Sequence, residues 1–325
     1  MHSTHDEVDL RLQVARRAAG ADDVAVLTLR DPTGGQLPAW SPGAHVDLKL
    51  PGGVVRQYSL CSDPYDRSVW KIGVLHEPAG RGGSKYVHEH MHEGTDLDVR
   101  GPRNNFPLMP SPHYVFIAGG IGITPILPMV VAAQQDGATW ELHYGGRSRS
   151  SMTFLDVLDG LDAISSPGRR VTLYPQDAVG LIDLDRILST PRPETLVYCC
   201  GPEQLIVEVE KRCAQWPSET LHVERFSPKE QGERAMPGDF EVELNESGIT
   251  LTVPPDKSIL QVIEEAGVAV QSSCTEGTCG TCETVVLAGE VDHRDSLLTD
   301  AEQAANDVMF ICVSRAACPK LVLKL

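Results

Sequence analysis

Cys274-Thr-Glu-Gly-Thr-Cys279-Gly-Thr-Cys282 is the stretch of this sequence that constrains the fold most, and Cys312 follows it with a spacing of C-x4-C-x2-C-x29-C. Three cysteines this close together must lie in one loop, and a fourth far along the chain must return to them from another element. Gly277 and Gly280 allow such a loop to curl with its backbone amides turned toward the sulfurs. The pattern indicates a metal site held by four thiolates.

Two kinds of metal site use four cysteine ligands. The C-x4-C-x2-C spacing with a distant fourth cysteine is that of a plant-type [2Fe–2S] cluster. A structural zinc site usually pairs two short C-x2-4-C knuckles, and this sequence has only one, so zinc is the alternative. Cys318 is a rival fourth ligand, which we expect to be a buried free thiol instead. The predicted ligands of the cluster are Cys274, Cys279, Cys282 and Cys312.

Composition excludes several classes of protein. The 325 residues are 41% hydrophobic and 22% charged, which is typical of soluble globular domains. The formal charge of −17 makes a nucleic-acid partner an unlikely reading, because such binding needs a basic face. From residue 238 onward, 15 acidic and 5 basic residues give −10, against −7 for the preceding 237 residues. The acidic excess is therefore concentrated in the part of the chain that holds the cysteine motif.

The cysteines and the apolar runs also bear on location. Nine cysteines, an odd number with four in one motif, argue against a secreted disulfide framework. The polar segment Met1–Asp9 has no apolar signal-peptide core. Tyr114–Ala133 is uncharged and twenty residues long, but three glycines and two prolines interrupt it. We expect a cytoplasmic protein without a membrane span.

The first part of the chain, residues 1–107, has the pattern of short strands. Pro-Gly, Gly-Gly and Ser-Asp-Pro turns separate the apolar runs. Strands at this spacing indicate a small antiparallel β-barrel. The predicted strands are Val24–Leu29, His45–Leu50, Val54–Leu60 and Val69–Leu75.

Residues 108–226 alternate between strands and helices, which indicates an α/β domain with an open parallel sheet. Thr124 is expected to cap the helix that begins at Pro125. The predicted strands are Val115–Ala118, Trp140–Tyr144, Val171–Tyr174 and Leu196–Cys199, and the helices are Pro125–Gln135, Thr153–Leu158, Asp183–Leu188 and Pro202–Gln215.

Residues 227–237 have a linker composition, rich in charge, proline and glycine. Residues 238–325 then open with a predicted hairpin, Phe240–Leu244 and Thr250–Val253, and a helix over Ser258–Ala266. The chain is thus predicted to be multidomain, with a β, an α/β and an α+β part.

Two strand ends in the α/β part suit a dinucleotide. Ile117-Ala118-Gly119-Gly120-Ile121-Gly122-Ile123-Thr124-Pro125 joins a strand to a helix through a glycine turn. Free backbone N–H groups and the helix dipole favour a diphosphate there. The turn lacks the G-x-G-x-x-G order of a Rossmann fingerprint. Cys199-Cys200-Gly201-Pro202 ends another strand, and ligands bind at such carboxyl edges.

Two further motifs lie in the predicted barrel. Arg56-Gln57-Tyr58-Ser59-Leu60 ends a strand, and Gly80-Arg81-Gly82-Gly83-Ser84 precedes a helix. An arginine near a Tyr-Ser pair can bind a phosphate or stack on a ring, and the Gly-Gly-Ser turn can hold a phosphate on its amides. Taken singly, each is equally consistent with an ordinary strand end or loop.

The order of these motifs along the chain carries a resemblance. R-x-Y-S, G-R-G-G-S, G-G-I-G-I-T-P, C-G-P and Glu224-Arg225-Phe226 follow the order of ferredoxin–NADP reductase-like flavoproteins. With the C-terminal cysteine motif, the whole chain resembles the phthalate dioxygenase reductase family, which includes vanillate demethylase reductases. The resemblance implies an FMN-binding barrel (1–107), an NAD-binding domain (108–226), a linker (227–237) and a ferredoxin-like β-grasp domain (238–325).

The resemblance also assigns roles to residues. Cys200, Glu224 and Phe226 are expected near the reacting rings, with Cys200 beside the nicotinamide and Phe226 against the flavin. The flavin itself would be held by Arg56, Tyr58, Ser59, Gly82, Gly83 and Ser84. The nicotinamide dinucleotide would be held by Gly120, Gly122, Thr124, Arg147 and Ser148.

The implied activity is electron transfer from NADH through FMN and the cluster to a separate terminal oxygenase, a Rieske non-haem iron enzyme, by a monomeric reductase. NADPH stays open, since Arg147 and Arg149 could pair with its 2′-phosphate and the usual acid for the ribose is missing. Two alternatives from other classes remain: a self-contained NAD(P)H flavin oxidase, and a binding module with a zinc-holding tail.

Several histidines and cysteines that could suggest a functional site are expected to have only structural roles. His88, His90 and His92 would share a face in a strand but not in the helix predicted for Lys85–Glu93, so we expect no metal there. Cys61, Cys199 and Cys213 are expected to be core thiols.

Overall fold

The computed structural model describes residues 7–163, 169–229 and 232–325. The chain divides into two compact units, Met1–Glu224 and Arg225–Leu325. The start of the predicted barrel domain and two residues of the predicted linker lie outside the described residues. In what the structure describes, no helix combines the length and apolar character needed to cross a membrane.

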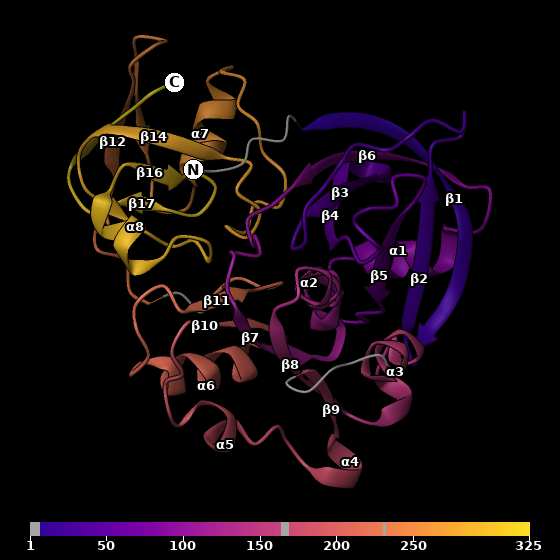
Figure 1. The fold of residues 1–325 in the computed structure, drawn as a ribbon. Coiled ribbons are helices and arrows are strands. Elements are labelled where there is room, and N and C mark those ends of the chain that lie inside the picture. Colours follow the sequence, from indigo (N-terminus) through magenta and orange to yellow (C-terminus); the bar gives the residue numbers. More distant parts are fainter. Residues whose placement is uncertain (1–6, 164–168, 230–231) are drawn as a thin grey trace. The chain divides into compact units, whose positions relative to one another are not determined.

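The N-terminal part of the first unit is an antiparallel barrel (Figure 1). Its six strands have the order β4-β3-β6-β1-β2-β5, and a bridge between Leu60 and Ile72 joins the two ends of the sheet. Helix α1 (Gly83–His90) connects β5 to β6. The strands are β1 (Val8–Ala21), β2 (Val24–Arg30), β3 (His45–Leu50), β4 (Val54–Ser59), β5 (Trp70–Leu75) and β6 (Asp96–Arg103).

Four of these strands match the sequence prediction, but β1 and β6 were not predicted. In β1 the run Arg16-Arg17-Ala-Ala-Gly hides the alternation, although Leu12 and Val14 are fully buried. In β6 the alternation is present, because Leu97 and Val99 are buried between the charged residues Asp96, Asp98 and Arg100. High charge and a Gly-Pro pair concealed a strand whose inner face is apolar.

The second part of the first unit is a parallel sheet, as predicted, but it has five strands, and the edge strand β11 was not predicted. The strand order is β11-β10-β7-β8-β9, and buried side chains pack helices onto both faces (Figure 1). The strands are β7 (His113–Gly119), β8 (Thr139–Gly146), β9 (Arg169–Pro175), β10 (Thr195–Cys200) and β11 (Leu221–Glu224). The helices are α2 (Ile123–Gln135), α3 (Leu155–Ala163), α4 (Gln176–Val179), α5 (Leu184–Leu188) and α6 (Glu203–Cys213).

The prediction that Thr124 caps the helix after the glycine turn was wrong. Helix α2 begins at Ile123, following the 3-10 turn η2 (Gly120–Gly122), so Thr124 is its second residue. The Thr124 hydroxyl donates to the Ile121 carbonyl at 2.9 Å, and the side chain is buried. The 3-10 turn η2 leads directly into α2, and the N-cap residue Gly122 has no side chain to cap the helix.

The second unit is built on a mixed sheet of order β13-β12-β18-β14-β16 with a small ladder β15-β17. The predicted hairpin and helix are present, and the Ser258 hydroxyl caps α7 by accepting from Gln261 N. The elements are β12 (Phe240–Leu244), β13 (Ile249–Val253), α7 (Ile259–Glu265), β14 (Glu283–Ala288), β15 (Val291–Asp292), α8 (Asp300–Ala305), β16 (Val308–Phe310), β17 (Arg315–Ala316) and β18 (Lys320–Leu323).

Candidate functional site

Three predicted site residues of the first unit meet where three strands end. Cys200 is the last residue of β10, Glu224 is its register partner on β11, and Ser59 ends the barrel strand β4. The Ser59 hydroxyl lies 3.5 Å from Glu224 Oε2, and the Cys200 thiol lies 3.9 Å from the same oxygen. The structure thus brings a barrel strand and the carboxyl edge of the parallel sheet together at one carboxyl group.

The electrostatics of this group favour neutral side chains. Desolvation by burial raises the pKa of Glu224 to about 8, which the two neighbouring donors only partly offset. Burial and the nearby carboxyl raise the pKa of Cys200 well above that of an ordinary thiol. Near pH 7 the site therefore holds a protonated carboxyl and a thiol, so neither Glu224 nor Cys200 carries a charge.

The barrel motifs come together at the start of α1. Arg56 Nη2 donates to the Arg81 carbonyl at 2.9 Å, and a Cβ on Gly83 would come within 2.4 Å of Arg56 Cγ. Gly82 has a φ of +83° directly before the helix, and the Ser84 hydroxyl accepts from the Glu77 amide at 3.0 Å. Glycine is needed here for both the turn and the close approach of arginine. An arginine beside a free helix N-terminus fits a phosphate group.

Tyr58 lies on β4 between Arg56 and Ser59 and packs against the barrel core. Burial raises the pKa of the Tyr58 hydroxyl to about 12, so the side chain is neutral. A neutral aromatic ring at this point of the strand fits a planar partner such as a flavin ring.

The glycine turn after β7 touches the end of β10. A Cβ on Gly122 would lie 2.3 Å from the Cys200 carbonyl oxygen, so only glycine fits. Gly120 has a φ of +53°, in the left-handed region. Gly201 makes a second, less close approach, since its Cβ would lie 3.0 Å from Gly119 Cα. The two strand ends thus pack against each other, and the partly exposed Gly120 and Gly201 lie where a diphosphate would approach the backbone.

Arg147 and Ser148 follow β8 at the same carboxyl edge. Ser148 caps the 3-10 turn η3 (Arg149–Ser151) through a hydrogen bond from Ser151 N. The Asp177 amide donates to the Arg147 carbonyl at 3.2 Å. Asp177 is an exposed carboxylate in the first turn of α4, after the neighbouring strand β9. Sequence reasoning missed this acid because it lies on the next strand end, 30 residues from Arg147.

In the second unit the four cysteines of the opening motif are all buried. Cys274 lies within hydrogen-bonding reach of Cys279 and Cys312, and Cys282 lies within reach of Cys312. The thiols thus converge, with Cys279 beside Cys274 and Cys282 beside Cys312. No three His, Cys, Asp or Glu side chains in the described ranges are grouped to hold a metal ion. Four thiols placed as two pairs fit a two-iron cluster, which would take two cysteine ligands for each iron.

The loop that carries three of the ligands is shaped for sulfur. Backbone amides of Glu276 and Thr281 donate to the sulfurs of Cys274 and Cys279 at 3.3 and 3.4 Å. Gly277 has a φ of +70°, and a Cβ there would lie 2.6 Å from Val313 Cγ2. Amide donors of this kind stabilise negative charge on thiolates and on a cluster.

The remaining predicted residues differ in how far they are buried. Phe226 belongs to the second unit and is 44% exposed. Cys318 is partly exposed, so the prediction of a buried thiol was wrong, while Cys61, Cys199 and Cys213 are buried in cores as predicted. Thr124 is buried under its helix, and its methyl group would lie 2.9 Å from a Cβ on Gly73 of the barrel.

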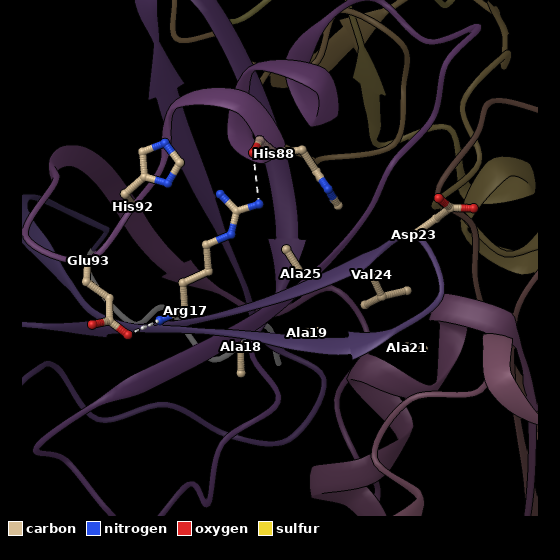
Figure 2. A pocket seen from close by; sticks show the side chains of 10 residues that line it. All are labelled: Arg17, Ala18, Ala19, Ala21, Asp23, Val24, Ala25, His88, His92 and Glu93. Atoms are coloured by element: carbon tan, nitrogen blue, oxygen red, sulfur yellow. Dashed lines mark hydrogen bonds between the residues drawn. The ribbon is translucent and has the colours of Figure 1, made fainter.

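One pocket contains none of the predicted site residues. It lies between the β1–β2 hairpin and the end of α1 (Figure 2), and its lining includes Arg17, His88 and His92. His88 Nε2 lies 2.9 Å from the Val74 carbonyl, and His92 Nε2 lies 3.1 Å from the Glu89 carbonyl. The two rings are each tied to a different backbone carbonyl.

Comparisons with known proteins match both chemical halves of the site. Residues 242–317 match the 2Fe-2S iron-sulfur cluster binding domain, and residues 116–211 match the oxidoreductase NAD-binding domain. The chain is 42% identical over 325 residues to phenoxybenzoate dioxygenase subunit beta of Ectopseudomonas oleovorans, covering 99% of each chain. It is 36% identical over 327 residues to phthalate dioxygenase reductase of Burkholderia cepacia, with full coverage of both.

Solved structures agree. The structure of phthalate dioxygenase reductase, described as modular for electron transfer from pyridine nucleotides to [2Fe-2S], superposes with a TM-score of 0.70 at 36% identity over 98% of each chain. An intact type IV self-sufficient cytochrome P450 monooxygenase gives 0.89 at 45% identity over 98% of this chain. This chain spans only 41% of that monooxygenase.

One explanation accounts for three findings: the match of the whole chain, the convergent cysteines, and the three strand ends at Glu224. A flavin reductase joined to a two-iron ferredoxin domain needs each of these parts, with FMN, NADH and [2Fe–2S] as cofactors. The chain therefore belongs to the phthalate dioxygenase reductase family of flavin iron–sulfur oxidoreductases.

Proposed function

We propose that this protein is the reductase component of a two-component oxygenase system and that its electron acceptor is a Rieske non-haem iron oxygenase. The observation that carries the proposal is the convergence of Ser59, Cys200 and Glu224, which joins the flavin strand to the dinucleotide edge. The family's curated relatives include subunits of dioxygenase and demethylase systems. Such a system needs a reductase and a separate oxygenase.

The residues of the first unit act by position. Gly120, Gly122 and the end of β10 would hold the dinucleotide, while Arg56 and the start of α1 would hold the flavin phosphate. The neutral Cys200 and Glu224 side chains would border the place where the two rings meet. Bound FMN would supply the exchange between two electrons that arrive together as a hydride and single electrons, which a [2Fe–2S] cluster carries one at a time.

The second unit contributes buried thiolate ligands and amide donors. Four cysteines would hold the cluster, and the amides of Glu276 and Thr281 would stabilise its charge. No general acid or nucleophile is required of the protein, because the cofactors perform the redox chemistry. NADH is the proposed coenzyme, since the Asp177 amide is bonded to the Arg147 carbonyl and an acidic residue beside this segment disfavours a 2′-phosphate.

A second acceptor class is favoured by one specific observation. Among the solved structures, the self-sufficient P450 superposes with a higher TM-score, 0.89, than phthalate dioxygenase reductase, 0.70. A haem monooxygenase is therefore the second candidate for the acceptor. The same flavin and cluster machinery would serve either acceptor.

The experiment offers the purified chain, with NADH and under anaerobic conditions, an oxidised Rieske oxygenase in one cuvette and a ferric P450 in another. The proposal expects the Rieske absorbance to bleach at a rate that depends on the concentration of the chain. Reduction of the haem alone would replace the proposed acceptor by the second candidate. Oxygen consumption with neither acceptor, at a rate unaffected by Cys279→Ser, would instead indicate a flavin oxidase.

A further inference from the structure

The loop that follows β8 is tied to the barrel by a pair of hydrogen bonds. The Asp22 amide donates to the Ser150 carbonyl at 2.8 Å, and the Ser150 hydroxyl donates to Asp22 Oδ2. Asp22 lies in the tight turn between β1 and β2, whereas Ser150 lies in η3. Residues 128 positions apart in the chain thus make both a backbone and a side-chain bond.

These bonds continue to the predicted coenzyme residues. The Ser150 hydroxyl lies 3.0 Å from the Ser148 hydroxyl, and the Ser148 N–H donates to the Ser151 hydroxyl at 3.1 Å. Ser148 directly follows Arg147 at the carboxyl end of β8. A hydrogen-bonded path therefore runs from the Asp22 carboxylate to the segment proposed to hold the ribose of the dinucleotide.

The barrel surface beside this contact has no room for larger side chains. A Cβ on Gly20 would lie 2.7 Å from Thr153 Oγ1, immediately after the loop. A Cβ on Gly73 would lie 2.9 Å from Thr124 Cγ2 and 3.3 Å from Ile121 Cδ1, next to the glycine turn. The barrel thus meets both coenzyme loops at close range, with glycine at each closest point.

The hairpin that carries Asp22 is itself held in place. Figure 2 shows Arg17, on β1, reaching the end of α1. Its two Nη atoms donate to the His88 and Met91 carbonyls at 2.8 and 2.9 Å. The β1–β2 hairpin is therefore bonded at two places: Arg17 bonds the C-terminal end of α1, and Asp22 in the turn bonds the loop after β8. The hairpin thus links α1 to that loop.

We propose that Asp22 is a positioning residue for coenzyme binding: through Ser150 it holds the Arg147–Ser148 segment in the geometry that binds NADH. The inference rests on the proposed function, which assigns Arg147 and Ser148 to the dinucleotide. Asp22 does not touch the coenzyme in this scheme. Its loss lets the loop leave its binding position, so affinity falls while the flavin and cluster sites stay intact.

The test uses the full-length protein loaded with flavin and cluster. The dissociation constant for NAD⁺ is measured by calorimetry for the wild type, Asp22→Ala, Ser150→Ala and the double variant. We expect a rise of about three- to tenfold for each single variant, the loss that one hydrogen bond at an exposed position explains. The double variant should add little, because both changes remove the same contact.

Controls separate positioning from folding. Asp23→Asn removes a charge from the same turn and should leave the NAD⁺ affinity unchanged, while Asp22→Asn, which keeps an acceptor oxygen, should recover most of it. KM for NADH should rise, whereas kcat, the flavin content and the melting temperature should stay unchanged. An unchanged affinity in Asp22→Ala, a loss of flavin with the affinity, or an equal effect in Asp23→Asn would overturn the inference.

A further variant distinguishes this inference from the proposed function. Arg147→Ala should weaken NAD⁺ binding if the assignment of the loop is right. If Arg147→Ala weakens binding and Asp22→Ala does not, only the inference fails. If neither variant changes the affinity, the assignment of the loop to the coenzyme fails with it.

Discussion

The Ser59 hydroxyl and the Glu224 carboxyl lie 3.5 Å apart although 165 residues separate them in the chain. One ends a barrel strand and the other ends the edge strand of the parallel sheet. The pair sits at the junction of the two sheets of the first unit, where the Cys200 thiol also points at Glu224. A carboxyl group at such a junction is desolvated by both sheets, so its protonation state depends on the fold.

Glu224 is expected to make stability fall as pH rises. Its pKa is about 8 in the fold against an ordinary value of 4.5, so folding takes up a proton between these values. The stabilisation is complete below pH 4.5 and is lost as pH rises to about 8, by at most about 1.4 kcal/mol per pH unit. Glu224→Gln, a neutral side chain of similar shape, lacks this dependence.

The measurement is the melting temperature of both proteins from pH 5.5 to 8.5. The difference, variant minus wild type, should increase steadily with pH over this range. Two parallel curves would mean that Glu224 is ionised in the folded protein across the whole range.

Replacing one cluster ligand should divide the activity into two parts. In Cys279→Ser, iron and acid-labile sulfide should fall to a small fraction of the wild-type content, and reduction of a one-electron acceptor protein should be lost. Flavin reduction by NADH should persist, because the flavin and coenzyme residues belong to the other compact unit. Cys318→Ser is the matched control, since the sulfur of this partly exposed thiol is bonded to backbone groups of Glu290 and Lys320. Equal loss of both activities in Cys279→Ser would contradict the electron path.

Gly122→Ala should disrupt the coenzyme edge. The added methyl group would lie 2.3 Å from the Cys200 carbonyl oxygen and 2.7 Å from Gly201 N, both of them backbone atoms. Relief requires the two strand ends to separate, at a cost of about 1–3 kcal/mol, and the affinity for NAD⁺ should fall by more than tenfold. Unfolding in urea and NAD⁺ titration measure the two effects.

Gly160→Ala is the control for that variant. Gly160 is exposed in α3 and does not have a positive φ, and among the described residues no atom beyond its chain neighbours and its own helix backbone lies within 4 Å of an added Cβ. The substitution should stabilise the protein by up to about 1 kcal/mol through helix propensity and leave coenzyme binding unchanged. If both alanine variants bind NAD⁺ like the wild type, the strand edge is not the coenzyme site.

Much of the fold could be predicted because its determinants are local. The cysteine spacing, the glycine turn and the alternation of strands and helices each follow from short-range geometry. Strand β6 escaped because its charged outer face masked Leu97 and Val99, and Asp177 escaped because strand order, which is not a local property, brings β9 beside β8. The juxtaposition of Ser59 with Glu224 depends on how two sheets pack, which no short motif encodes.

Asp177 is expected to set the choice of coenzyme. It is exposed in the first turn of α4, and its amide is bonded to the Arg147 carbonyl, so this acidic residue adjoins the segment proposed to hold the ribose. A 2′-phosphate there meets like charge, which at an exposed site amounts to about 0.5–1 kcal/mol. Asp177→Asn should therefore raise kcat/KM for NADPH roughly two- to fivefold, with little change for NADH. Steady-state kinetics with both coenzymes measure this; an equal change for both would assign Asp177 a structural role.

The charge of the second unit is expected to govern docking with the acceptor. Residues 238–325 carry 15 acidic and 5 basic side chains. Three of the basic side chains are bonded to acidic neighbours: Lys257 to Glu265, Arg294 to Asp292, and Lys320 to Glu243, at 2.7–2.9 Å. A fourth, Arg315, is buried and donates to the Pro254 and Lys257 carbonyls. The net negative field is therefore little neutralised at the surface.

Such a field steers a partner with a basic patch and raises the association rate. Coupled turnover with the oxygenase should fall severalfold between about 50 and 300 mM salt, since added ions shorten the Debye length to below about 8 Å. Flavin reduction by NADH, measured in the same buffers without the oxygenase, supplies the control and should change little. Lys320→Glu, which makes the unit more acidic at an exposed position, should steepen the salt dependence. Coupling that is independent of salt would show that docking relies on apolar contacts, and it would leave the redox assignment unchanged.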